Sequence, residues 1–209
     1  MSSLYDANCR ACPRLASFLD GVRIERPDYF AHPVPPFGAK KPNLLVVGLA
    51  PGMHGANRTG RPFTGDYAGI LLYQTLYKFG FANKVGTADP GDGLVLDKCR
   101  VTNAVKCLPP ENKPLPAEVK LCNGFLSAEI ASARPRAILA LGTVAHAAVL
   151  RAVGLRPAGF RFAHRARHDL GGTVMFDSYH CSRYNTNTGR LTTEMFEAVF
   201  RDIEAFLAG

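Results

Sequence analysis

Six cysteines are the first residues in this 209-residue sequence whose spacing could support chemistry. Cys9 and Cys12 are separated by two residues, a spacing that lets two thiolates face one metal centre. Cys107 and Cys122 follow later in the chain, each beside a predicted loop or helix end. Four thiolates suit a [4Fe–4S] cluster or a structural zinc ion. Because the second pair lacks a tight spacing, ordinary reduced cysteines are the alternative interpretation.

The other two cysteines and the N-terminal residues indicate the compartment. Cys99 opens a predicted strand and is expected to be a small buried residue, whereas Cys181 lies in a loop where either role fits. The sequence begins without a basic segment followed by an apolar run, and no apolar run reaches the ~18 residues of a membrane span. We therefore expect a cytoplasmic protein without membrane contact, in a reducing environment where cysteines bind metals or do chemistry.

A glycine-rich stretch from Leu44 to Gly69 is the second candidate for chemistry. It begins with the apolar run Leu44 to Val47, which has the composition of a buried strand, and it continues into a helical pattern from Tyr67. The loop between them matches neither a dinucleotide fingerprint nor a P-loop. A strand that leads through such a loop into a helix places its ligand at the C-terminal edge of a sheet.

Polar residues follow three of the predicted strands. The glycine loop carries Phe63 and Asp66, the second strand carries Asn103, and the last strand ends at His180. In an open α/β sheet these ends meet at one crevice, where a phenylalanine could stack on a flat heterocycle and an amide could read its edge. The alternatives are a core-filling Phe63, an Asn103 bonded to neighbouring backbone and a structural His180.

Basic residues on loops at the same edge predict contact with a polyanion. The formal net charge is +8 and the sequence pI is about 9.4, although a merely basic protein would give the same values. Each cation alone is a solvated charge, but together they would supply phosphate contacts. The residues concerned are Arg58, Arg61, Lys106, Lys113, Arg183 and Arg190.

The elements that position these residues form one α/β domain over residues 1–209. Apolar content is 47% and charged content 20%, which is typical of a globular chain. The expected architecture is a three-layer α/β/α fold whose four-stranded parallel sheet is covered on both faces. Strands are predicted at 44–47, 99–105, 137–142 and 173–180. Helices are predicted at 13–21, 67–80, 116–133, 144–152 (capped by Thr143) and 192–207. Loops are predicted at 83–98 and 154–172.

Several motifs together resemble those of family 5 uracil-DNA glycosylases. They read G-L-A-P-G-x-H-G-A-N-R-T-G-R-P-F-T-G-D-x-A-G, T-N-A-V-K-C, P-P-x-N-K-P and H-x-S-x-x-N-T-x-T-G-R-L-T, and they span the chain from Cys9 to Thr192. The resemblance implies a four-stranded parallel sheet and a [4Fe–4S] cluster bound by Cys9, Cys12, Cys107 and Cys122. It also implies excision of uracil from DNA, and often of other deaminated bases such as hypoxanthine.

The resemblance also implies roles for single residues. Phe63 matches the ring that stacks on the base, Asn103 the amide that reads the uracil edge, and His180 the residue that stabilises the leaving base. Gly48 and Ala50 line the base-binding edge. The segment from Ser182 to Arg190 matches the loop inserted into the duplex, with Arg183 or Tyr184 as the wedge.

Two positions bear on how the chemistry is done. Relatives with a strong water-activating residue carry an acid or amide where this sequence has Leu49 and Ala50, so Asp66 is the nearest motif carboxylate that could orient water. Cys181 stands where the motif usually has proline, which bears on the stiffness of the insertion loop. We expect a monomer acting on DNA at the nucleoid. The rival functions are a non-catalytic iron–sulfur protein that binds nucleic acid and a hydrolase of free nucleotides.

Overall fold

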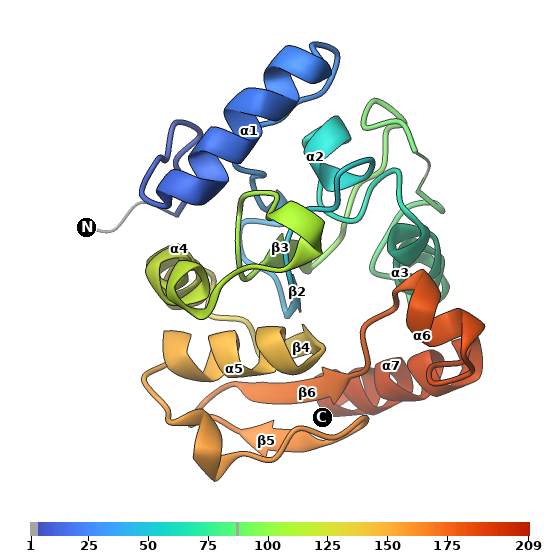
Figure 1. The fold of residues 1–209 in the computed structure, drawn as a ribbon. Coiled ribbons are helices and arrows are strands. Elements are labelled where there is room, and N and C mark those ends of the chain that lie inside the picture. Colours follow the sequence, from blue (N-terminus) through green and yellow to red (C-terminus); the bar gives the residue numbers. More distant parts are fainter. Residues whose placement is uncertain (1–3, 87) are drawn as a thin grey trace.

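A single sheet with helices on both faces forms the fold (Figure 1). The computed structural model describes residues 4–86 and 88–209, so Met1 to Ser3 of the predicted N-terminus and Thr87 of the predicted loop 83–98 lie outside it. The strand order is β1-β3-β2-β4-β6-β5. The four central strands are parallel, as predicted: β2 (Leu44–Gly48), β3 (Cys99–Asn103), β4 (Ala137–Leu141) and β6 (Val174–Ser178).

Two short edge strands were missed by the prediction of a four-stranded sheet. β1 (Phe37–Gly38) pairs antiparallel with β3, and β5 (Arg167–Asp169) pairs antiparallel with β6. The first directly follows Pro35 and Pro36, and the second lies within the segment predicted as a loop at 154–172. Strands of two and three residues are too short to show an alternating apolar pattern, so only their pairing defines them.

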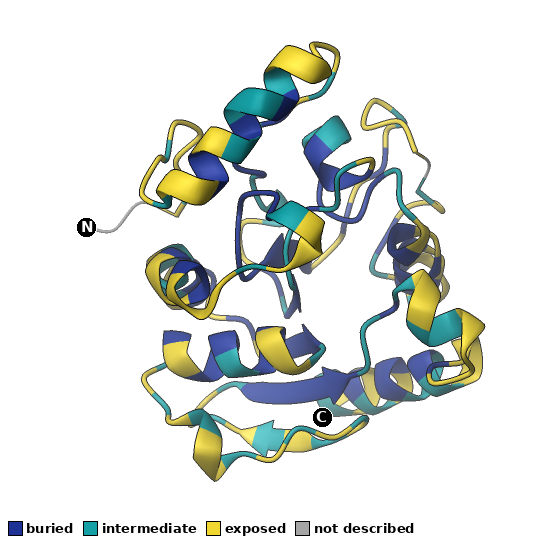
Figure 2. Cartoon of the chain, viewed as in Figure 1, coloured by how far each residue is buried: buried dark blue, intermediate teal, exposed yellow. Residues whose placement is uncertain are grey.

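The helices divide between two faces of the sheet. α1 (Pro13–Glu25), α4 (Pro116–Ala133) and α5 (Thr143–Ala152) pack on one face, where their apolar residues meet Leu45 and Val47 of β2. α3 (Tyr67–Lys78) and α7 (Thr193–Ala208) pack on the other face, against Leu44 and Val46. The four central strands are buried throughout, and the long helices expose their outward sides (Figure 2). This explains why the central strands are continuous apolar runs.

Short helices occupy several predicted loops. These are α2 (Ala56–Thr59), the 3₁₀ turn η1 (Pro110–Asn112), the 3₁₀ turn η2 (Pro157–Gly159) and α6 (Arg183–Asn187). The predicted cap of α5 was wrong, because Thr143 is the first helical residue and Gly142, with φ +91°, precedes it without a side-chain bond. Within the described ranges, every helix is too short or too polar to cross a membrane.

The parallel register places three strand ends at one edge of the sheet. Gly48, the last residue of β2, lies directly beside Asn103, the last residue of β3. β6 ends at Ser178, two residues before His180. The glycine loop that follows β2 and the segment that follows β6 therefore leave the sheet on the same side.

Candidate active site

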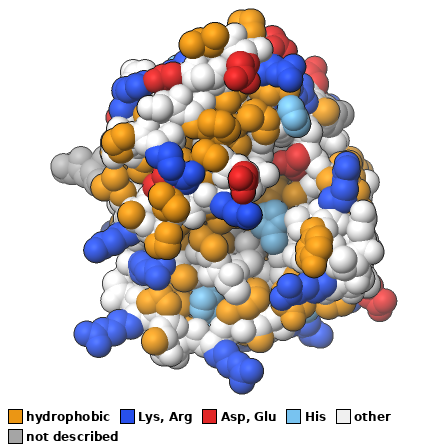
Figure 3. Space-filling view, in the orientation of Figure 1, with side chains coloured by type: hydrophobic (Ala, Val, Ile, Leu, Met, Phe, Trp, Pro, Cys, Tyr) orange, Lys and Arg blue, Asp and Glu red, His pale blue; other side chains and the backbone are white. Residues whose placement is uncertain are grey.

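A cavity of about 450 Å³ opens at the C-terminal ends of β2, β3 and β6. Its lining includes Phe63 and Asp66 from the glycine loop, Asn103 from β3 and His180 from the segment after β6. The structure thus brings together the four residues that the sequence marks for base recognition and chemistry. In a space-filling view this face is hollowed near its middle, with basic side chains spread around it (Figure 3).

Asn103 lines the cavity and carries a buried side-chain oxygen, Oδ1, without a hydrogen-bond partner among the described residues. Its side chain is 4% exposed. Burying an amide oxygen without a partner is costly, so a ligand that donates to it would recover that cost. Gly48 makes room for this arrangement, because a Cβ there would lie 2.5 Å from both Asn103 Oδ1 and the Phe63 ring. A larger residue at Gly48 would push both groups out of place.

Phe63 lies flat beside His180 at the base of the cavity. Their ring centres are 5.9 Å apart with an interplanar angle of 26°, which is a stacked arrangement. Phe63 has φ +53°, a left-handed conformation that is rare for an aromatic residue. Backbone strain of this kind persists where the surrounding structure holds it, often at functional sites. The surrounding structure holds Phe63 in this conformation in the lining of the cavity.

His180 is held as a neutral imidazole. Burial lowers its pKa from the usual value to about 4. The backbone is fixed by the Asn185 side-chain amide, which donates to the His180 carbonyl oxygen at 2.8 Å. Among the described residues none hydrogen-bonds a ring nitrogen of His180, so an N–H of the neutral ring is free to donate to a bound ligand.

Asp66 faces the same cavity from the start of α3. Its Oδ1 accepts a hydrogen bond from the Gly69 backbone N–H at 2.9 Å, which makes it the N-cap of that helix. Burial raises the pKa of this carboxyl, while the backbone N–H groups of Gly69 and Ala68 act in the opposite direction. Gly55 allows Asp66 its position, because a Cβ there would lie 2.4 Å from Oδ2. The carboxylate is thus oriented by the helix and turned towards the loop.

The cavity contains no other acid in the part of the chain that the structure describes. Leu49 and Ala50, which directly follow β2, line it with apolar groups only. Neither side chain can accept a proton from water. Any activation of water by a side-chain carboxylate in this cavity must therefore come from Asp66.

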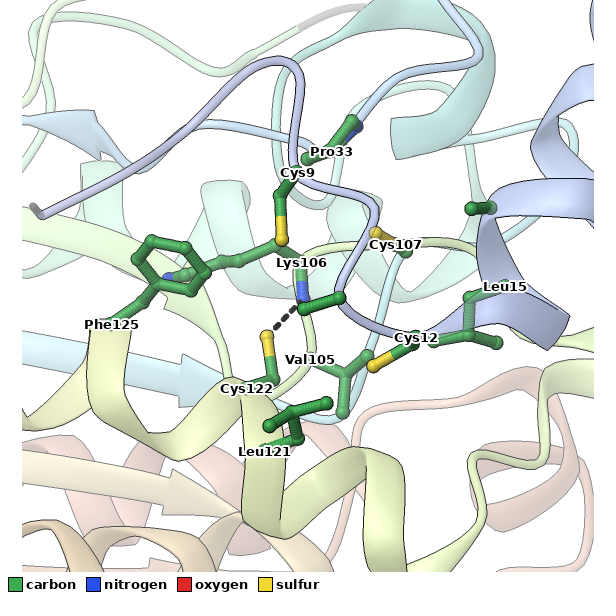
Figure 4. Close-up of a pocket in the computed structure, with 12 residues that line it drawn as sticks. Cys9, Cys12, Leu15, Pro33, Val105, Lys106, Cys107, Leu121, Cys122 and Phe125 are labelled. Carbon is green, nitrogen blue, oxygen red and sulfur yellow. Dashed lines mark hydrogen bonds between the residues drawn. The ribbon is translucent and has the colours of Figure 1, made fainter.

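The four cysteines marked in the sequence line a second, smaller pocket. Cys9 lies before α1, and Cys12 lies at the start of that helix. Cys107 lies in the loop after β3, and Cys122 lies in α4. Their sulfurs point towards a common space (Figure 4). Cys122 Sγ also accepts a hydrogen bond from the Lys106 backbone N–H at 3.4 Å.

The chemistry of this pocket is compatible with a bound metal group. Sulfurs bound to one tetrahedral zinc at about 2.3 Å lie about 3.8 Å apart. Within the described residues, no three of these four sulfurs all lie within 4.8 Å of one another. Burial and the neighbouring cysteines raise the pKa of Cys12 to about 11 and of Cys107 to about 12, which shows that the four groups share one environment. Four thiolates in one pocket are compatible with an iron–sulfur cluster.

Two of the predicted phosphate contacts were wrong. Lys106 is 2% exposed, and its Nζ lies 3.1 Å from Glu129 Oε2 and bonds Thr102. Arg61 is also buried and forms a bidentate pair with Asp92 at 2.8 and 3.0 Å. Both cations neutralise buried carboxylates, so neither can reach a DNA backbone.

A Lys106→Met variant is expected to lose stability without losing contact with DNA. It leaves the buried Glu129 carboxylate with Thr102 and with Arg100 at 3.6 Å, and breaking a buried pair costs about 3–5 kcal/mol. Chemical denaturation and the salt dependence of DNA binding would be measured side by side. A normal stability with a reduced salt slope would show that Lys106 meets phosphate after all.

The other predicted DNA-contacting residues remain on the surface or at the cavity mouth. The Lys113 side chain is 81% exposed, Tyr184 is 72% exposed, and Ser182 caps α6 while lining the cavity. Arg183 lies over the Tyr67 ring at 5.3 Å and Arg190 over Tyr179 at 4.7 Å. Arg58 is half-buried and donates to the His54 carbonyl oxygen. Of these residues, Ser182 and Arg183 line the cavity itself.

Sequence reasoning missed Asn112 as a residue of the cavity. Asn112 lines the mouth between Asp66 and Arg183, and with Glu111 it adopts a left-handed backbone. In the P-P-E-N-K-P stretch, the sequence predicts a role for Lys113 only. Glu111 and Asn112 are consecutive non-glycine residues in the left-handed conformation, and no sequence pattern predicts that conformation here.

Comparisons with known proteins agree on one family. The family model described as the uracil DNA glycosylase superfamily matches residues 35–204. A Type-5 uracil-DNA glycosylase from Thermus thermophilus is 45% identical over 208 residues, covering 96% of this chain and 94% of the relative. A Type-5 enzyme from Pyrobaculum aerophilum is 42% identical over 198 residues, covering 93% and 87%. A Type-4 uracil-DNA glycosylase from the same organism is 36% identical over 129 residues, covering 61% of this chain and 58% of the relative.

Proposed function

The chain belongs to the uracil-DNA glycosylase superfamily and hydrolyses the bond between uracil and deoxyribose in DNA, and we propose that it works mainly by expelling the base. One observation carries this proposal. The cavity contains a neutral His180 whose ring N–H is free to donate, whereas Leu49 and Ala50 have no group that could activate water. The cavity is better equipped to stabilise a leaving group than to activate water.

The geometry supports a division of roles among three residues. The target nucleotide is flipped out of the duplex so that its base enters the cavity. Phe63 offers a flat face for stacking, and Asn103 offers an unpaired oxygen that can accept from the base N3–H. His180 donates to the base oxygen on which negative charge develops as the glycosidic bond breaks. The hydrogen bond at His180 therefore strengthens in the transition state.

Asp66 has the smaller role in this proposal. Its carboxylate is the one acid of the described cavity, so it can orient the water that attacks the sugar and stabilise the positive charge that develops there. DNA phosphates next to the flipped nucleotide share that stabilisation. Because the sugar cation has two sources of negative charge, neutralising Asp66 removes only one of them.

We propose that the cavity also accepts hypoxanthine. At about 450 Å³ it is open enough for a purine as well as for a pyrimidine. An Asn103→Ala variant is expected to slow uracil excision more than hypoxanthine excision, because the lost oxygen matches the pyrimidine edge. Single-turnover release of free base would be measured on matched duplexes that carry one uracil or one hypoxanthine. Equal losses on both would show that Asn103 does not read the pyrimidine.

We also propose that Cys9, Cys12, Cys107 and Cys122 hold a [4Fe–4S] cluster. When bound, such a group would supply a rigid cross-link between three segments distant in sequence. Here it would join the N-terminal segment to α4 and to the loop after β3, in which Cys107 lies four residues after Asn103, the last residue of β3. The proposed role is structural, because the cysteines line a pocket that shares no residue with the cavity.

We propose that the exposed cations near the cavity mouth contact DNA. We also propose that the protein acts as a monomer and that it acts at the nucleoid. A Lys113→Ala variant should reduce the slope of log affinity for DNA against log salt concentration by about one. The reason is that DNA binding releases about one fewer counterion for each phosphate contact that is lost. Lys40 is an exposed lysine before β2, at the opposite edge of the sheet, so Lys40→Ala is the control. If both variants keep the wild-type slope, Lys113 makes no phosphate contact.

A further inference from the structure

A second cluster of metal-binding side chains lies on the α5 side of the sheet, apart from both the cavity and the cysteines. His146 comes from α5, His168 from β5 and Asp177 from β6. One ligand atom from each lies within 4.8 Å of the others. Asp177 is fully buried, and the His146 side chain is 4% exposed. Neither the sequence motifs nor the proposed reaction assigns these residues a role.

The hydrogen bonds of His146 leave a place for a cation. Its Nε2 faces the Phe160 carbonyl oxygen at 3.1 Å, and its Nδ1 faces Asp177 Oδ1 at 2.9 Å. The Phe160 carbonyl and the Asp177 carboxylate both accept hydrogen bonds, but a neutral imidazole has only one N–H. If Nε2 carries that hydrogen and donates to Phe160, the lone pair of Nδ1 points at the Asp177 carboxylate. A second proton or a metal ion must lie between those two atoms. Donation of the distant ring nitrogen to a backbone carbonyl is the usual arrangement of a metal-bound histidine.

The remaining distances match a tetrahedral site with two nitrogen and two oxygen donors. His168 Nε2 lies 2.9 Å from Asp177 Oδ2, so each carboxylate oxygen faces one imidazole. The ring centres of His146 and His168 are 5.3 Å apart at 71°. Two imidazoles bound to one tetrahedral zinc through bonds of about 2.0–2.1 Å have centres about 5.2 Å apart. The side chains therefore need little movement to surround an ion.

The surroundings of the cluster favour a permanently bound ion. Phe160 packs on His168 and Phe162 on His146, at 5.8 and 5.6 Å between ring centres, which shields the cluster from water. In the described part of the chain, only the two imidazoles lie within ion-pair distance of Asp177. A buried carboxylate without a lysine or arginine partner requires another source of positive charge.

We propose that His146, His168 and Asp177 form a structural binding site for a divalent cation of the zinc class. Imidazole nitrogens with a carboxylate suit zinc among the common metals of the cell. The ion would tie α5 and β5 to β6, the strand that leads to His180 three residues after Asp177. The site is independent of the proposed base-excision reaction and of the cysteine pocket.

Zinc content and melting temperature would test the site in the full chain purified without oxygen, so that the cysteine pocket keeps its iron. After dialysis against a chelator, the protein is titrated with zinc, and bound zinc is counted by mass spectrometry. His168→Asn removes a half-buried ligand, and His164→Asn is the matched control, a half-buried histidine four residues earlier outside the cluster. Zinc at other sites is common to all variants and cancels in the comparison.

Wild type and His164→Asn are expected to bind about one more zinc per chain than His168→Asn. Zinc at one hundred times its Kd should raise their melting temperature by about 5–10 °C. Cobalt in place of zinc should give the visible bands of a tetrahedral nitrogen–oxygen site. Asp177→Asn, which keeps the side-chain shape, should lose the same signals if His168→Asn does not fold. Equal zinc content and an equal zinc-induced rise in melting temperature in wild type and both cluster variants would overturn the site. In that case protons, and not a metal ion, would lie between the imidazoles and the Asp177 carboxylate.

Discussion

A His180→Ala variant is expected to excise uracil about 10²–10³ times more slowly than wild type in a single turnover. The variant removes the hydrogen bond to the departing base, which is strongest in the transition state. The Phe63 stacking face and the Asn103 oxygen stay in place, so binding of the flipped base should weaken much less. The loss should therefore appear in the chemical step. Circular dichroism and iron content would show whether the fold survives, and a wild-type rate would reject the role of His180.

The pH dependence of the wild type follows from the neutral state of His180. Its pKa of about 4 lies below the usual value near 6.5, so the ring stays neutral from pH 8 to pH 6 and its contribution to the rate should stay constant there. The same shift affects folding. As the pH falls below about 6.5, the unfolded chain binds a proton that the folded chain excludes, so this contribution to stability is lost towards pH 4.

The second large effect is expected from Cys107→Ala. Removing one of four ligands should release the iron and lower the melting temperature by more than 10 °C, or prevent soluble folding. The expected loss is large because the free energy of binding a structural metal is about 10–16 kcal/mol in small zinc domains. This is comparable to the whole free energy of unfolding of a protein, which is about 5–15 kcal/mol. Iron and sulfide analysis with thermal unfolding would measure both consequences.

Cys99→Ala is the matched control for the cysteine pocket. Cys99 is fully buried in β3 and lies outside the pocket, so its loss removes only packing. This variant should keep its iron and melt close to wild type. If Cys107→Ala retained a full complement of iron, Cys107 would not be a ligand. Zinc in place of iron in wild-type protein purified without oxygen would contradict the identity of the group.

The central strands and long helices could be predicted from the sequence because each buries a continuous or periodic apolar pattern. Leu44 to Val47 is apolar on both faces, and its strand is indeed covered on both faces. The convergence of Asn103 and His180 followed from the same logic, since parallel strands end at one edge. The short edge strands β1 and β5 could not be predicted, because pairing with distant residues is their only signal.

The buried cations show where sequence reasoning failed. Lys106 follows a strand and Arg61 lies in a glycine loop, positions that normally expose a charge. Their partners Glu129 and Asp92 are 23 and 31 residues away, and only the tertiary fold brings them together. The His146 cluster has the same origin, because its three residues come from three separate elements. Long-range pairing of charged groups leaves no local pattern in a sequence.

The central claim is that the enzyme expels the base and depends little on activating water. The most direct test compares the single-turnover rates of His180→Ala and Asp66→Asn on one duplex that carries uracil, with wild type as reference. We expect Asp66→Asn to remain clearly faster than His180→Ala, because DNA phosphates share the stabilisation of the positive charge on the sugar. An Asp66→Asn enzyme without activity, together with a His180→Ala enzyme at the wild-type rate, would contradict it.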